Sequence, residues 1–225
     1  MKLRFFIIFL GLSFLGGCVS GTGRHVKPSN EMVSLPEVRK NIIVYHDSGQ
    51  YYKDVAAKAK SVAKAVQKAL DAKIKYPAVV MSVEDVLLST FEVRRKQGFS
   101  DNSAASKDLE SHVILSTLPS IDSSVSLFEF LLSRHIPVFL VSHRPEVLRI
   151  SVMENLTKAG FSGWKSLYMM PPGYPSGLNY YEEVRKGLQK SGFNIIATVG
   201  ATSQETEGHF TGKAVLYPNY IYLER

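Results

Sequence analysis

The chain has 225 residues, of which 45% are hydrophobic and 21% are charged, an ordinary composition for a globular protein. Its single cysteine excludes a framework of internal disulfide bonds. The formal charge of +7 suits an anionic membrane surface or a ligand that carries phosphate. Because no zinc-finger spacing or RNA-recognition motif occurs, nothing in the sequence indicates a nucleic-acid partner.

The first 17 residues have the pattern of an export signal, with a positive start and an apolar run at residues 5–15. That run is too short to span a bilayer as a helix. A Leu-Gly-Gly-Cys sequence that matches the bacterial lipobox ends at Cys18. We therefore predict a lipoprotein signal peptide at residues 1–17 and acylation of Cys18, for example by palmitate. The alternative is a plain signal peptide that happens to contain a cysteine.

An acylated Cys18 would hold the exported protein on membrane lipid, since several acyl chains anchor a protein stably. Val19 stands where an aspartate retains many lipoproteins at the inner membrane, which favours the outer membrane of a Gram-negative cell, facing the periplasm or the cell surface. Residues 18–40 are rich in Gly, Ser, Thr, Pro and Asn and are typical of a flexible tether.

A helical pattern covers residues 41–72, with apolar residues at helical spacing on one side. Four lysines lie on or near the opposite side: Lys53, Lys60, Lys64 and Lys68. They are expected either to form an ordinary solvated surface or to contact anionic lipid headgroups.

The rest of the chain alternates between strand and helix patterns. Short apolar runs predict strands at residues 78–81, 137–141, 167–170, 194–199 and 213–216. Helical patterns lie at residues 123–134, 145–159 and 180–190, with Pro145 placed in a first helical turn. The interval from Phe91 to about Leu118 is polar and weakly patterned. This alternation predicts an α/β fold with a mostly parallel sheet and helices on both faces.

Polar residues follow the first strand, at the carboxyl end where ligands bind in open α/β sheets. Ser82-Val83-Glu84-Asp85 resembles the Asp-x-Asp-Glu that ends the first strand of the haloacid-dehalogenase-like (HAD-like) acid phosphatases of subfamily IIIB. That family includes the class B and C bacterial phosphatases and the plant vegetative storage proteins. The resemblance implies a HAD-like, Rossmannoid domain at residues 41–225, with a helix before the first strand and a small helical cap at about residues 90–118.

The resemblance also implies roles for individual residues. Ser82 stands at the nucleophile position and Glu84 at the general acid/base position. Ser142 and Arg144 match the phosphate-binding residues of the second strand, although Ser142 could instead cap the following helix. Tyr181 stands at the position of a phosphate-binding lysine.

The metal site implied by the resemblance is altered. Ala201 stands where the family has an aspartate that holds Mg²⁺, while Glu205 keeps a carboxylate at the other metal position. None of the six histidines has the spacing of a metal-ligand pair, and His143 is the one that the resemblance places at the pocket. Mg²⁺ is therefore expected only if residual activity exists.

The losses at Ser82, Ala201 and Tyr181 predict a catalytically impaired pseudo-phosphatase with a binding or scaffolding role, because catalytic groups that act as a unit fail together. Its expected partners are membrane lipid through Cys18 and a phosphate-bearing small molecule or an envelope protein. One alternative is a phosphomonoesterase with altered chemistry that uses Ser82, Glu84 or Asp85. Another is a structural protein of the membrane surface that works through its lysines.

Overall fold

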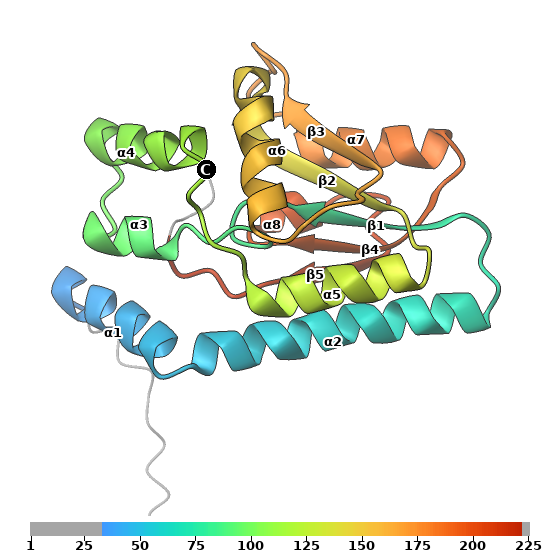
Figure 1. The fold of residues 1–225 in the computed structure, drawn as a ribbon, viewed down its shortest axis with the longest axis horizontal. Helices are drawn as coiled ribbons and strands as arrows, with labels where there is room; N and C mark the ends of the chain where they lie inside the picture. Colours follow the sequence, from blue (N-terminus) through green and yellow to red (C-terminus); the bar gives the residue numbers. More distant parts are fainter. Residues whose placement is uncertain (1–32, 222–225) are drawn as a thin grey trace, which may run out of the picture. The chain divides into compact units, whose positions relative to one another are not determined.

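The computed structural model describes residues 33–221, in which a five-stranded sheet is covered by helices (Figure 1). The strand order is β3-β2-β1-β4-β5, and every neighbouring pair is parallel. The strands are β1 (Pro77–Ser82), β2 (Val138–Pro145), β3 (Ser166–Met170), β4 (Asn194–Gly200) and β5 (Lys213–Leu216). This confirms the predicted α/β fold with a parallel sheet.

Two apolar clusters cover the two faces of the sheet. On one face, α2 (Gln50–Asp71), α5 (Asp122–Ser133) and α6 (Arg149–Lys158) pack on side chains that include Val79 and Met81. On the other face, α7 (Tyr180–Lys190) packs on Val80 and Val141. The chain moves outward from β1 to β2 and β3 and then returns across the sheet to β4. Right-handed crossovers therefore put α5 and α6 on one face and α7 on the other.

Two helices lie between β1 and α5, in the interval that we expected to form a cap: α3 (Phe91–Lys96) and α4 (Ser103–Ile114). They lie off one end of the sheet (Figure 1). The side chain of Asn102 caps α4 by accepting a hydrogen bond from the backbone of Ala105 at 2.9 Å. The amide of Asn155 in α6 pairs with both backbone groups of Leu118, at 3.0 and 2.7 Å, and so fixes the chain between α4 and α5.

The N-terminal region differs from the prediction of one helix over residues 41–72. It forms two helices, α1 (Leu35–Asp47) and α2, separated at Gly49, whose φ of 77° is in the left-handed region that favours glycine. Residues 35–40, which we expected in the tether, belong to α1, and Ser34 caps that helix through a hydrogen bond from the backbone of Glu37. The predicted signal peptide and Cys18 lie outside the described residues.

The helix predicted at residues 145–159 starts later than expected. Pro145 is the last residue of β2, and the short 3-10 helix η1 (Glu146–Leu148) precedes α6. The fixed φ of proline fits an extended residue as well as a first helical turn, so the sequence alone did not decide between them. Within residues 33–221, no helix is both long enough and apolar enough to cross a membrane.

Candidate functional site

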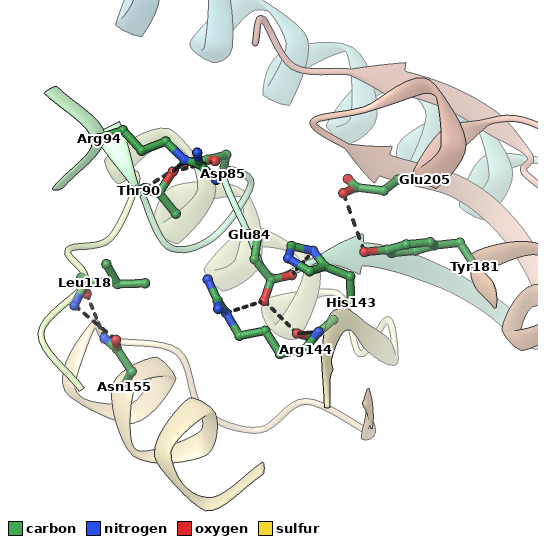
Figure 2. Close-up of polar contacts among 11 residues, drawn as sticks. Glu84, Asp85, Thr90, Arg94, Leu118, His143, Arg144, Asn155, Tyr181 and Glu205 are labelled. Atoms are coloured by element: carbon green, nitrogen blue, oxygen red, sulfur yellow. Dashed lines mark hydrogen bonds and ion pairs between the residues drawn. The ribbon is translucent and has the colours of Figure 1, made fainter. Parts of the chain in front are cut away.

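The turn after β1 brings two acidic residues to the carboxyl end of the sheet, and Asp85 has a structural role there. Its φ of 50° bends the chain sharply, and its backbone N–H donates to the carbonyl of Leu88 at 2.8 Å. Its carboxylate accepts hydrogen bonds from the N–H of Thr90 at 2.7 Å and from the Thr90 hydroxyl at 2.8 Å. Asp85 therefore ties the turn to the start of α3 (Figure 2).

Glu84 lies at the centre of a buried polar cluster at the ends of β1 and β2. Its Oε1 accepts a hydrogen bond from the Ser142 hydroxyl at 2.6 Å and lies 3.2 Å from Nε of Arg144. Its Oε2 lies 3.4 Å from Nδ1 of His143, which is about half exposed (Figure 2). The Ser142 hydroxyl also accepts the N–H of Arg144 at 3.1 Å. The positive charge of Arg144 therefore compensates the buried carboxylate of Glu84.

Glu205 lies across the end of β4 in a second buried cluster. Its Oε2 accepts the N–H of Ala201 at 2.7 Å, its Oε1 lies 3.5 Å from the hydroxyl of Tyr181, and it also shares a hydrogen bond with Ser82. Burial raises the pKa of Glu205 to about 7, and the nearby charge of Glu84 adds to this effect. The Ser82 and Ala201 hydrogen bonds oppose the shift because they favour the charged form.

A glycine makes the position of Glu205 possible. A Cβ on Gly200 would lie 2.6 Å from the Glu205 Cβ and 2.9 Å from its Oε2. The buried guanidinium of Arg185 then holds the segment after Glu205 by donating to the backbone carbonyls of Glu205, Glu207 and His209. The role of Gly200 was not predicted from the sequence, where its position directly before Ala201 is the one feature that could have indicated it.

Five side chains that the resemblance places at the site are buried. At most 3% of each is exposed: Ser82, Glu84, Ser142, Tyr181 and Glu205. A cavity of about 10 Å³ lies beside Glu84 and Arg144, which is room for about one water molecule. The structure therefore brings the predicted site residues together in a buried polar cluster at the carboxyl ends of the strands, and their roles stay predictions.

The donor set here does not fit Mg²⁺, which prefers six oxygen ligands. Within residues 33–221, no group of three or more His, Cys, Asp or Glu side chains is placed to hold a metal ion. Ala201 offers no side-chain ligand, and its N–H instead holds the carboxylate of Glu205.

Comparison with known proteins settles the family. The family model described as HAD superfamily, subfamily IIIB (acid phosphatase) matches residues 23–224. The chain belongs to this family. The predicted family is thereby confirmed, and the fold is HAD-like.

Relatives of this acid phosphatase family are found in plants. Vegetative storage protein 1 of Arabidopsis thaliana is 27% identical over 145 residues, which cover 64% of this chain and 54% of that protein. Acid phosphatase 1 of Solanum lycopersicum is 25% identical over 146 residues, which cover 64% of this chain and 57% of that protein. The chain thus spans little more than half the length of the curated relatives that it matches.

Solved structures show the same fold. The class C acid phosphatase from Bacillus anthracis superimposes with a TM-score of 0.68 at 14% identity, over 84% of this chain and 86% of that one. A structure of that enzyme with tungstate bound gives a TM-score of 0.62 at 16% identity, with the same coverage. The fold of this acid phosphatase family is therefore preserved, while the roles of Ser82, Glu84, Ser142, Arg144, Tyr181 and Glu205 in any chemistry stay predictions.

Proposed function

We propose that this protein is a lipid-anchored bacterial envelope protein that keeps the acid phosphatase fold without hydrolysing phosphate esters, and that it binds or scaffolds a partner. The position of Glu205 is the observation that carries this proposal. Its carboxylate bonds with Ser82 and with the N–H of Ala201, the two positions where the resemblance implies a nucleophile and a metal ligand. A phosphate ester would have to displace a buried side chain from both.

The charges near Ser82 also support the proposal. Phosphoryl transfer depends on cations that stabilise the charge of the transferred group. Among the residues that the resemblance assigns to the site, Arg144 is the only one with a permanent positive charge, and Glu84 already compensates it at 3.2 Å. Tyr181 brings a neutral phenol to the lysine position.

A second candidate is a phosphomonoesterase with altered chemistry, and one observation favours it. Ser82 shares a hydrogen bond with Glu205, whose pKa of about 7 would suit a general base at neutral pH. Both side chains are buried, however, at 2% and 3% exposure, so a substrate reaches them only if the site opens.

Hydrolysis of p-nitrophenyl phosphate separates the two candidates. The full chain with Cys18→Ser, purified in detergent, is assayed with and without Mg²⁺ beside the matched variants Ser82→Ala, Glu205→Gln and Glu207→Gln. We expect product release no faster than in buffer for every protein. Turnover that is lost in Ser82→Ala and Glu205→Gln, but kept in the exposed control Glu207→Gln, would overturn the proposal and establish the esterase.

Lipid anchoring is tested in cells, because it depends on Cys18. We expect the wild-type chain to incorporate an alkyne-tagged palmitate and the Cys18→Ser chain to incorporate none. Equal labelling of the two chains would remove the anchor from the proposal.

A further inference from the structure

One side of α2 carries a row of four exposed lysines, Lys53, Lys60, Lys64 and Lys68. At 100° per residue they fall within a strip of about 80°, on the side of the helix opposite the buried Val62. At 1.5 Å per residue the row is about 22 Å long. In the part of the chain that the structure describes, none of the four forms an ion pair.

An apolar groove runs beside this row, between α2 and α5, which lie side by side in Figure 1. The groove has a volume of about 340 Å³. Its walls are mostly small or apolar side chains: Ala56, Ala59, Lys60, Ala63, Ser123, Ser126, Leu127 and Phe130. Since Lys60 belongs both to the row and to the groove, the two form one continuous surface, which we call the α2–α5 face.

The charges around the α2–α5 face are mainly positive. The guanidinium of Arg134 lies 5.5 Å from the ring centre of Phe130 and adds a cation beside the groove. The exposed carboxylates of α5, Asp122 and Glu129, lie about 40–160° around that helix from the groove-lining side chains, and neither lines the groove. Asp71 ends the lysine row and accepts a hydrogen bond from Gln67 at 2.8 Å.

We propose that the α2–α5 face docks on a bilayer that contains anionic phospholipid, with the lysines at the headgroup phosphates and an acyl chain in the groove. A phospholipid matches both halves of this face, because it joins a negative headgroup to an apolar chain. A nucleic acid would match only the lysines. The inference shares the membrane location with the proposed function, but it depends neither on acylation of Cys18 nor on the loss of hydrolysis.

A fluorescence experiment on the full chain tests this. Cys18→Ser removes the only native cysteine, so a single fluorophore can be placed at Ala56→Cys in the groove or at Gln189→Cys on α7, which packs on the other face of the sheet. The chain is reconstituted on phosphatidylcholine vesicles with or without phosphatidylglycerol, all brominated on the acyl chains. We expect quenching at position 56 and not at 189, only with phosphatidylglycerol, and its loss in 0.5 M salt.

A charge-matched comparison shows whether the lysine row is responsible. Each lysine near an anionic surface strengthens docking roughly fivefold, so replacing all four by glutamine should weaken it several hundredfold and abolish the quenching at position 56. The control replaces four exposed lysines elsewhere by glutamine: Lys107, Lys158, Lys165 and Lys190. It should leave the quenching unchanged, and thermal melts of both variants should match that of the parent.

Three results would overturn the proposal. The first is position 56 remaining unquenched on phosphatidylglycerol vesicles. The second is an equal loss of quenching in the control, which would show that only total charge matters. The third is tight, salt-sensitive binding of duplex DNA by the lysine row without acyl-chain quenching, which would assign the row to nucleic acid.

Discussion

Replacing Glu205 by glutamine should change how the stability of the protein depends on pH. The pKa of Glu205 rises from 4.5 to about 7 on folding, mainly because of burial. Between these two values the folded state holds a proton that the unfolded state has released, so the free energy of unfolding falls as pH rises. The loss amounts to about 3 kcal/mol, at 1.36 kcal/mol per unit of pKa, and it is complete above pH 7.

Glutamine keeps the volume of the side chain and an acceptor for the N–H of Ala201, while the hydroxyls of Ser82 and Tyr181 can accept from its amide. Glu205→Gln should therefore match the wild type near pH 4.5 and be more stable by about 3 kcal/mol near pH 8. Urea unfolding at pH 5, 6, 7 and 8 measures the difference, and the exposed Glu207→Gln serves as the control. If the difference in the free energy of unfolding between the wild type and Glu205→Gln stays constant from pH 5 to pH 8, the carboxylate is not buried as described.

Three further variants test the surroundings of the site and the N-terminal helices. Gly200→Ala should lower the free energy of unfolding in urea by about 1–3 kcal/mol, because its Cβ would overlap Glu205. The control Gly187→Ala, in open space on α7, should raise it by about 0.5–1 kcal/mol. A mild effect at both positions would contradict the position of Glu205 beside Gly200. Arg185→Met should cost about 3 kcal/mol or more, since three backbone carbonyls lose their donor, and unchanged unfolding would refute that role. His46 is stacked between the rings of Tyr51 and Phe91, with centroids 3.9 and 3.5 Å away, and burial lowers its pKa to about 4. The thermal stability of the wild type should therefore fall as pH drops from 6.5 towards 4. A His46→Phe variant whose stability has the same pH dependence would exclude His46 as the cause.

Most of the sheet could be predicted from the sequence because local signals and the fold agree there. The strand at residues 213–216 and the helix at residues 180–190 have the predicted ends. That helix begins after Asn179, which caps it by accepting from the backbone of Glu182 at 3.1 Å, and Gly192 follows it with a φ of 90°. Where an N-cap residue, a following glycine and apolar residues at helical spacing all agree, the sequence is compatible with only one helix.

The helices α1 to α4 were harder to predict, because contacts between distant segments determine where they begin and end. The break at Gly49 follows an Asp-Ser pair and could have been recognised as a loop signal. Phe91, the first residue of α3, stacks on the ring of His46 with centroids 3.5 Å apart, so α3 is held by a contact with α1 that no local pattern reveals. The position of Glu205 is likewise not visible in any local pattern, because it depends both on the space beside Gly200 and on the turn after β4.

The distribution of charge differs between the end of β1 and the outside of α2. Beside Ser82 the described side chains bring two carboxylates, Glu84 and Glu205, and Arg144 is already paired with the first of them. A phosphate dianion placed there would meet the charge of Glu84, and above pH 7 also that of Glu205, in a poorly solvated site, which costs several kcal/mol unless a cation offsets it. Exposed lysines, by contrast, are concentrated on α2, where water solvates them until a partner arrives. We therefore expect an anionic partner to bind on the outside of α2 rather than at the end of β1.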